Sequence, residues 1–183
     1  RLVTTLDRAI GFAQSVLDYG RETSVPPVLK PTRIKPLVDE AAFDARLSPH
    51  PTIAFTNAAP DGLVLKVDAG QLGRALLNLF KNAREALEAE GARIAAPAVS
   101  LSIVQGAQGI TLSVADNGPG LPPRARDKLF VAFEGSARAG GTGLGLAIAR
   151  EIVEAHGGQL SLVDQPVGSR FDLVLPSSLQ VKT

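Results

Sequence analysis

A polar strip that contains two asparagines lies within a helical pattern over residues 72–87. Apolar residues recur there at helical spacing, and at about 100° per residue Asn78, Asn82 and Glu85 fall together on the opposite face. An Asn within a helix destabilises it by about a few tenths of a kcal/mol relative to Ala. On a solvent-exposed helix surface, Glu, Lys, Arg or Gln is more favourable. The polar strip therefore indicates either a binding site or a solvent-exposed surface.

A carboxylate and two glycines directly follow a predicted apolar strand at residues 110–115. Residues 116–120 read DNGPG, so the carboxylate of Asp116 lies at the strand end, and Gly118 and Gly120 flank a proline. Such a turn is rigid and lets a ligand approach the backbone closely. A simple turn uses the same residue types, so this stretch alone leaves both interpretations open.

Residues 140–147 read GGTGLGLA and open a predicted helix. Helix N-termini present free N–H groups that bind phosphates, and glycines allow a phosphate to come close. A Walker A loop is excluded because its lysine position holds Gly141. The dinucleotide fingerprint is also excluded, because Gly141, Gly143 and Gly145 have the wrong spacing and no strand precedes them. The stretch predicts a phosphate-binding loop of another type.

Composition limits the class of protein. The 183 residues are 45% hydrophobic but only 4% aromatic, without Trp, which predicts one domain with an aliphatic core and an appendage. A net charge of +1 without a basic run argues against nucleic acid as a partner. The absence of Cys suits a cytoplasmic location, and no apolar run approaches the ~20 residues of a membrane span. Because Arg1 already falls within a helical pattern of apolar residues, we interpret the chain as part of a longer protein, with any membrane anchor outside it.

The N-terminal residues 1–22 are predicted to form a separate helical unit. Apolar residues recur there at alternating steps of four and three, which is typical of a coiled-coil or bundle seam that needs partner helices. A terminal helix packed on its own domain is the alternative. Residues 23–33 contain three prolines and predict a semi-rigid linker.

The remaining residues, 34–183, predict a two-layer α/β (α+β) sandwich with helices on one face of a mixed sheet. Asp68 is the expected N-cap of the central helix, and a long Gly/Pro-rich loop covers residues 116–145. Helices are predicted over 34–47, 72–87 and 144–156, with a short piece at 122–129; strands are predicted over 52–58, 63–67, 99–104, 110–115, 159–163 and 169–175. The turn at 60–62 joins the first two strands, and the later four form two hairpins.

Four of these stretches, in their order along the chain, resemble the motifs of sensor histidine kinases. Residues 78–85 resemble the asparagine box, 116–120 the first glycine box, 129–133 the phenylalanine box and 141–146 the second glycine box. The resemblance covers about residues 35–176 and implies a Bergerat-type ATP-binding domain. It also implies that the N-terminal helix is the second helix of a dimerisation hairpin.

The resemblance assigns roles to individual residues, with ATP and Mg²⁺ as cofactors. Asn82 is expected to coordinate Mg²⁺ with Asn78 nearby, and Asp116 to accept a hydrogen bond from the adenine amino group. A mobile lid over residues 122–140 is expected to bring Arg138 to the terminal phosphate. The full expected ATP-binding set is Asn78, Lys81, Asn82, Glu85, Asp116, Gly118, Gly120, Phe130, Arg138, Gly141, Thr142, Gly143, Leu144 and Gly145.

The sequence departs from the family pattern at three places. Glu85 stands where many members have a basic residue, which Lys81 or Arg84 could replace. The phenylalanine box lacks its usual proline. Asn78 stands where related ATPases have a water-activating glutamate, and an amide cannot act as that base. This favours phosphoryl transfer to a protein over hydrolysis, with Glu85 left open as a substitute base.

The phosphate acceptor is not apparent in this sequence. The resemblance implies a histidine on the first dimerisation helix, but His50 is predicted in a loop and His156 at a helix end. We therefore expect the acceptor upstream of Arg1 or absent from the protein. The resemblance implies a response-regulator receiver domain and a second copy of the chain as partners. An ATP-hydrolysing or ATP-switched clamp and a non-catalytic phosphotransfer adaptor are the alternatives.

Overall fold

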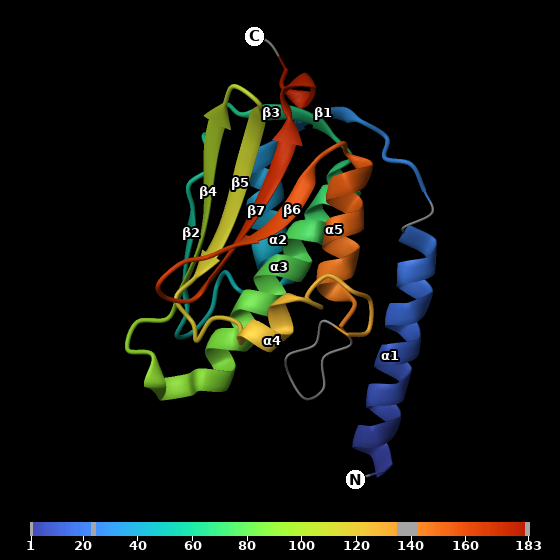
Figure 1. The fold of residues 1–183 in the computed structure, drawn as a ribbon, viewed down its shortest axis with the longest axis vertical. Coiled ribbons are helices and arrows are strands. Elements are labelled where there is room, and N and C mark those ends of the chain that lie inside the picture. The colour runs from blue at the N-terminus through green and yellow to red at the C-terminus, as the bar shows by residue number, and fades with distance from the viewer. Residues whose placement is uncertain (1, 23–24, 135–142, 182–183) are drawn as a thin grey trace.

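The computed structural model describes residues 2–22, 25–134 and 143–181. A five-stranded sheet forms one layer, and helices cover one of its faces (Figure 1). The helices are α1 (Leu2–Glu22), α2 (Ile34–Asp44), α3 (Ala69–Glu90), α4 (Pro123–Arg126) and α5 (Gly145–Ala155), with short 3-10 helices at Gly91–Arg93 and Ser177–Leu179. The predicted two-layer α/β sandwich is confirmed.

The strands form two sheets of different size. They are β1 (Lys30–Arg33), β2 (Ala54–Asn57), β3 (Val64–Val67), β4 (Ala98–Gly106), β5 (Gly109–Asp116), β6 (Gln159–Val163) and β7 (Ser169–Pro176). The large sheet has the order β2-β4-β5-β7-β6, in which only the β2–β4 pairing is parallel. The small sheet pairs β1 with β3 in antiparallel fashion. The sheet is thus mixed, as predicted.

The core is mainly aliphatic and lies between the large sheet and the helices α2, α3 and α5. Helix α3 crosses it in the middle and buries one face completely, with Leu72, Leu76 and Phe80 at 0% exposure. The Phe80 ring packs edge-on against Phe55 of β2 at a centroid distance of 5.2 Å. The apolar spacing of α3 therefore serves the core, and its polar strip remains outside it.

Helix α3 begins with a side-chain cap, as predicted. The Asp68 carboxylate accepts hydrogen bonds from the N–H of Gln71 at 3.1 Å and from that of Val28 at 2.9 Å. Burial raises the pKa of this carboxyl, but these N–H donors, together with the nearby His156 and the N–H of Gly70, lower the pKa below its ordinary value. His156 of the α5 C-terminus completes the junction, because its Nε2 accepts from the N–H of Asp68 at 3.1 Å.

Asp68→Ala is expected to lower the free energy of unfolding by about 1 kcal/mol at pH 7, the usual value of an N-cap. Because the pKa of Asp68 is lower in the folded chain, its contribution is present above the unfolded pKa of about 3.9 and disappears as the pH falls through the folded pKa. Urea unfolding at pH 7 and at successively lower pH tests this. A difference between wild type and variant that stays constant down to pH 2 would contradict it.

Three local predictions differ from the structure. The sequence predicted no regular structure in 23–33, whereas residues 30–33 form β1 along β3. The strands β2 and β3 are not partners of one another but belong to different sheets. Helix α2 also ends three residues earlier than predicted, because Arg46 adopts a positive φ of 56° after it.

Helix α1 stands beside α5 at the outside of the molecule (Figure 1). Its Tyr19 hydroxyl donates to Glu151 of α5 at 2.5 Å, and the Phe12 ring lies 5.8 Å from that of Phe133. Many of its apolar side chains are exposed, including Leu2, Leu6, Ile10 and Leu17. The predicted seam thus remains largely uncovered. Within the described ranges, none of the helices is both long and apolar enough to span a membrane.

Candidate functional site

The start of α5, which carries the second glycine box, lies against the middle of α3, which carries the asparagine box. A Cβ placed on Gly145 would lie 3.8 Å from Cγ of Asn78. The Nδ2 atom of Asn78 is buried and has no hydrogen-bond partner among the described residues. A buried amide donor of this kind calls for an acceptor, since leaving it unsatisfied costs about 1–3 kcal/mol. An anion at the start of α5 would supply one.

The turn after β5 lies farther along the same helix. Asp116 is 8% exposed, and its Oδ1 accepts a hydrogen bond from the N–H of Gly118 at 2.9 Å. A Cβ on Gly118 would lie 3.4 Å from Leu87 and 3.7 Å from Ala86, both of α3. The site therefore extends along α3 from Asn78 to Ala86, about 12 Å at 1.5 Å per residue.

Both flanks of the Asp116 turn are fastened to neighbouring segments. On one side, Asn117 accepts from the N–H of Ala98 and donates to the carbonyl of Ala96, each at 2.8 Å. On the other side, Gln165 donates through Nε2 to the carbonyl of Asp116 at 3.3 Å. Gly168, with φ of 74°, packs so closely on this carbonyl that a Cβ would overlap it. The backbone that carries the Asp116 carboxylate is thus held in place from both sides.

Ser169 belongs to this site, although sequence reasoning did not include it. It pairs directly with Asp116 in the antiparallel β5–β7 register and is 8% exposed. Its hydroxyl-bearing side chain occupies an inward position of β7, where the other buried residues are Phe171, Leu173 and Leu175. A polar residue at the inward end of an otherwise apolar alternating strand was the available signal.

The described ends of the glycine-rich loop meet one another. The N–H of Phe133 donates to the carbonyl of Gly143 at 3.2 Å. Gly143 has φ of 67°, and a Cβ there would lie 3.0 Å from the carbonyl carbon of Phe133. Phe133 itself has φ of 68°, a strained conformation for a bulky residue. The arrangement brings the phenylalanine box and the second glycine box together.

Three predicted site residues, Arg138, Gly141 and Thr142, lie outside the described residues. The predicted lid, residues 122–140, is described only to residue 134.

The remaining predicted residues of the turn and the loop are described. Phe130 is half-buried and packs edge-on against Phe171 at a centroid distance of 6.3 Å, and the guanidinium of Arg150 lies 5.7 Å from the Phe130 ring centroid. Gly120 lies beside the turn, where a Cβ would be 3.0 Å from the carbonyl oxygen of Gly168, and Leu144 is buried at the start of α5.

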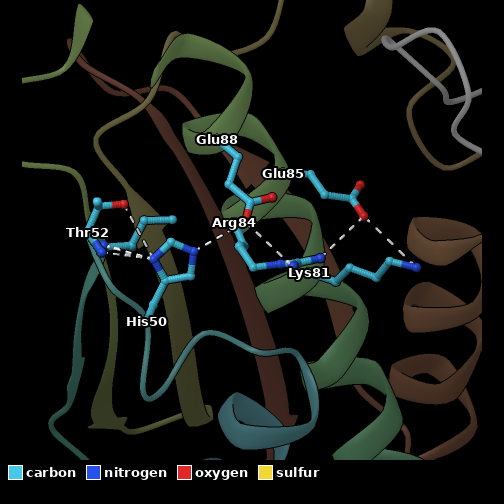
Figure 2. A network of polar contacts seen from close by, with 7 residues as sticks. His50, Thr52, Lys81, Arg84, Glu85 and Glu88 are labelled. Atoms are coloured by element: carbon cyan, nitrogen blue, oxygen red, sulfur yellow. Dashed lines mark hydrogen bonds and ion pairs between the residues drawn. The ribbon is translucent and has the colours of Figure 1, made fainter. Parts of the chain in front are cut away.

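Charged side chains continue the polar face of α3 beyond Asn82. Lys81 and Arg84 approach Oε1 of Glu85 at 4.0 and 3.7 Å, and Arg84 also approaches Glu88 at 3.6 Å. Figure 2 shows this chain of contacts running on to His50, whose Nε2 lies 3.2 Å from Glu88. Glu85 is thus paired with cations of its own helix, which does not suit a substitute base.

Neither histidine occupies a helix surface suited to accepting a phosphate. Nδ1 of His50 accepts from the N–H groups of Thr52 and Ile53, at 3.2 and 3.0 Å, in the loop before β2. His156 is 4% exposed; its Nδ1 lies 2.8 Å from the carbonyl of Ile152, and its Nε2 accepts from Asp68. Both rings thus hold backbone groups in place, and the predicted positions of His50 in a loop and of His156 at a helix end are confirmed.

Among the side chains that the structure describes, no group of three or more His, Asp or Glu residues could hold a metal ion by itself. A metal at this site therefore needs other oxygen donors. Amide oxygens, such as those of Asn78 and Asn82, combined with phosphate oxygens and water form a normal Mg²⁺ environment. The residues present fit such an ion together with a bound phosphate.

Comparison with known proteins agrees with this geometry. Residues 67–179, which run from the end of β3 to the end of the second 3-10 helix, match the family described as histidine kinase-, DNA gyrase B-, and HSP90-like ATPases. The chain belongs to this ATPase family. Asn78 and Asn82, the Asp116 turn, Gln165 and the start of α5 all lie inside the matched region.

The relatives of this chain include a nitrogen regulation protein and sensory histidine kinases. It is 30% identical over 167 residues to the nitrogen regulation protein NtrY of Azorhizobium caulinodans, covering 90% of this chain but 21% of that protein. It is 38% identical over 114 residues to the sensory histidine kinase/phosphatase NtrB of Escherichia coli O157:H7, covering 60% of this chain and 32% of that protein. The chain therefore spans only about a fifth to a third of these relatives.

Solved structures of histidine kinases share the fold. Full-length ShkA in complex with AMPPNP superposes with a TM-score of 0.76 at 27% identity, covering 97% of this chain and 37% of that one. The mycobacterial sensor histidine kinase MprB superposes with a TM-score of 0.68 at 30% identity, covering 81% of this chain and 97% of that one. The predicted resemblance to sensor histidine kinases is confirmed.

Proposed function

We propose that this chain is the ATP-binding catalytic domain of a sensor histidine kinase. It transfers the terminal phosphate of ATP to a histidine on a dimerisation helix, for relay to an aspartate of a response-regulator receiver domain. In the full protein, two copies pair through the helical hairpin to which α1 contributes, and the domain works in the cytoplasm. The observation that carries the proposal is the placement of the Asp116 turn and the start of α5 along one face of α3.

The two ends of that face suit the two ends of ATP. Asp116 accepts a hydrogen bond from the adenine amino group, and Gly118 and Gly120 leave room for the base and ribose. The phosphates lie toward Asn78 and the N-terminus of α5, where backbone N–H groups and the helix dipole favour an anion. Gly141, Thr142 and Arg138 are outside the described residues, and we propose that they complete the phosphate site.

Magnesium is expected between these ends, on the side-chain oxygen of Asn82 with Asn78 nearby. When bound with ATP, it neutralises phosphate charge during transfer. Lys81, which is exposed on α3, is expected to contribute further positive charge beside the phosphates. Water activation is not favoured, because Asn78 is an amide and Glu85 is paired with Lys81 and Arg84. Transfer to a protein is therefore preferred over hydrolysis.

Calorimetric titration of the chain with ATP, with and without Mg²⁺, tests the first half of this proposal. Incubating the loaded chain with a polypeptide that carries the upstream dimerisation helices and a histidine tests the second half. Binding of ATP followed by an acid-labile phosphate on that polypeptide is the expected result. Release of inorganic phosphate without transfer would favour the ATP-hydrolysing alternative, and failure to bind ATP would favour the phosphotransfer adaptor.

Asn82→Ala is expected to weaken Mg²⁺-dependent ATP binding by about tenfold, because it removes a metal ligand. Binding of ATP in the presence of a chelator should change little, since the base pocket is intact. Titrations of the variant with and without Mg²⁺ measure the two affinities separately. An equal loss under both conditions would mean that Asn82 does not bind the metal.

Neither His50 nor His156 is expected to acquire phosphate when the chain is incubated with labelled ATP. Both nitrogens of each ring are engaged in the folded chain, and phosphoryl transfer requires the acceptor in line with the terminal phosphate. Mass spectrometry of the labelled chain at neutral pH checks this. Stoichiometric phosphate on either residue would place the acceptor within these 183 residues.

A further inference from the structure

The loop between β6 and β7, residues 164–168, makes two contacts with the Asp116 turn that the proposed roles do not use. Gln165, a half-buried residue, donates from Nε2 to the backbone carbonyl of Asp116 at 3.3 Å. Gly168 packs on the same carbonyl, and its own carbonyl oxygen faces Gly120. The loop therefore touches the backbone at both ends of the predicted base-binding turn.

The same loop is tied to the segment that follows the turn. Asp164 forms an ion pair with Arg126 at the end of α4. Arg126 also donates through Nε to the carbonyl of Leu121 at 3.4 Å. A single guanidinium thus connects the residue after Gly120 with the loop that holds Asp116. The first helix of the expected lid is thus linked to the backbone carbonyl of Asp116 through the side chains of Arg126, Asp164 and Gln165.

We propose that the β6–β7 loop is a positioning element for base recognition, in which Gln165 sets the place of Asp116 and the Arg126–Asp164 pair ties the loop to α4. The inference rests on the proposed function, because it assumes that Asp116 reads the adenine amino group. A carboxylate distinguishes an amino group from a carbonyl only when its oxygen lies at hydrogen-bond distance from the base. Moving the Asp116 backbone therefore reduces selectivity for adenine before it reduces the stability of the fold.

The test compares the affinities for ATP and for inosine triphosphate, whose base carries a carbonyl where adenine carries the amino group. Gln165→Ala is expected to reduce the preference for ATP about three- to tenfold, the range of one hydrogen bond. Gln165→Glu, which keeps the shape but opposes the Asp116 carbonyl with an oxygen, should do the same. Gln105→Ala, at the far end of the β4–β5 hairpin, is the matched control and should leave the preference unchanged.

The ion pair is tested by a double-mutant cycle with the same readout. Arg126→Gln and Asp164→Asn should each reduce the preference about two- to fivefold, because an exposed pair contributes modestly. The double variant should be no worse than either single one, and the exchanged pair Arg126→Asp with Asp164→Arg should recover the preference. Melting temperatures measured in parallel are expected to stay close to that of the wild type.

The outcomes separate this inference from the proposed function. A wild-type chain without preference for ATP over inosine triphosphate would overturn the role of Asp116, and the inference with it. A wild-type preference that persists in Gln165→Ala and Gln165→Glu would overturn the inference alone. Equal losses for both nucleotides, or additive losses at Arg126 and Asp164, would also overturn it, because they would indicate general damage rather than positioning.

Discussion

Asp116→Asn is expected to weaken ATP binding by about 1.5–3 kcal/mol, which is about 10- to 150-fold in Kd. The amide oxygen of Asn can still accept from the N–H of Gly118, so the turn itself keeps its hydrogen bond. The other side-chain atom changes from an acceptor into an NH₂ donor, which would face the adenine amino group. The substitution therefore removes base recognition while preserving the local structure.

Titration with ATP and with GTP measures the effect on base recognition. The wild type should prefer ATP, because guanine places a carbonyl where adenine carries its amino group, and two acceptors would then oppose one another. Asp44→Asn is the matched control, since Asp44 is an exposed carboxylate at the end of α2. Equal affinities of the wild type for ATP and GTP would show that Asp116 does not select the base.

Phe80→Ala is expected to reduce the free energy of unfolding by about 3–5 kcal/mol. The side chain is completely buried on the core face of α3, and its edge-on contact with Phe55 joins this helix to β2. Truncation leaves a cavity between the two layers that the surrounding aliphatic residues cannot fill without moving. Because Asn78 and Asn82 are on the same helix, ATP binding should weaken as the fold loosens.

Urea denaturation followed by far-UV circular dichroism measures this loss. Phe43→Ala is the matched control, because the Phe43 ring on α2 is 66% exposed and its removal should cost less than about 0.5 kcal/mol. A similar cost for the two substitutions would mean that Phe80 does not carry the contact between the layers.

Local sequence patterns were sufficient for the central helix, its cap and the motif positions. The apolar period of α3 and the carboxylate of Asp68 are read within one or two helical turns, and both appear in the structure as predicted. The position of Asp116 at the end of a strand follows from the short apolar run that precedes it. Such features depend on neighbours in the sequence, which a single chain displays directly.

Pairings between distant segments could not be obtained in this way. Residues 30–33 have weak strand character and become β1 only because β3 offers them a hydrogen-bonding edge. Gln165 and Gly168 look like ordinary loop residues until the β5–β7 register places them over Asp116. Tertiary contacts determine these positions, and no periodic pattern of apolar residues in the nearby sequence indicates them.

The parallel pairing of β2 with β4 has a consequence for the order of folding. It joins residues 54–57 to residues 98–101, so the chain between them, which includes all of α3, forms a closed loop when the edge strand docks. Closing a loop of this length costs entropy before the contacts inside it are gained, which makes edge docking a late event. A nucleotide bound as proposed, between α3 and the β5 turn, binds only the folded domain and stabilises it as a whole. Ligand binding should therefore also protect the edge strand β2 from opening, although the ligand does not contact that strand.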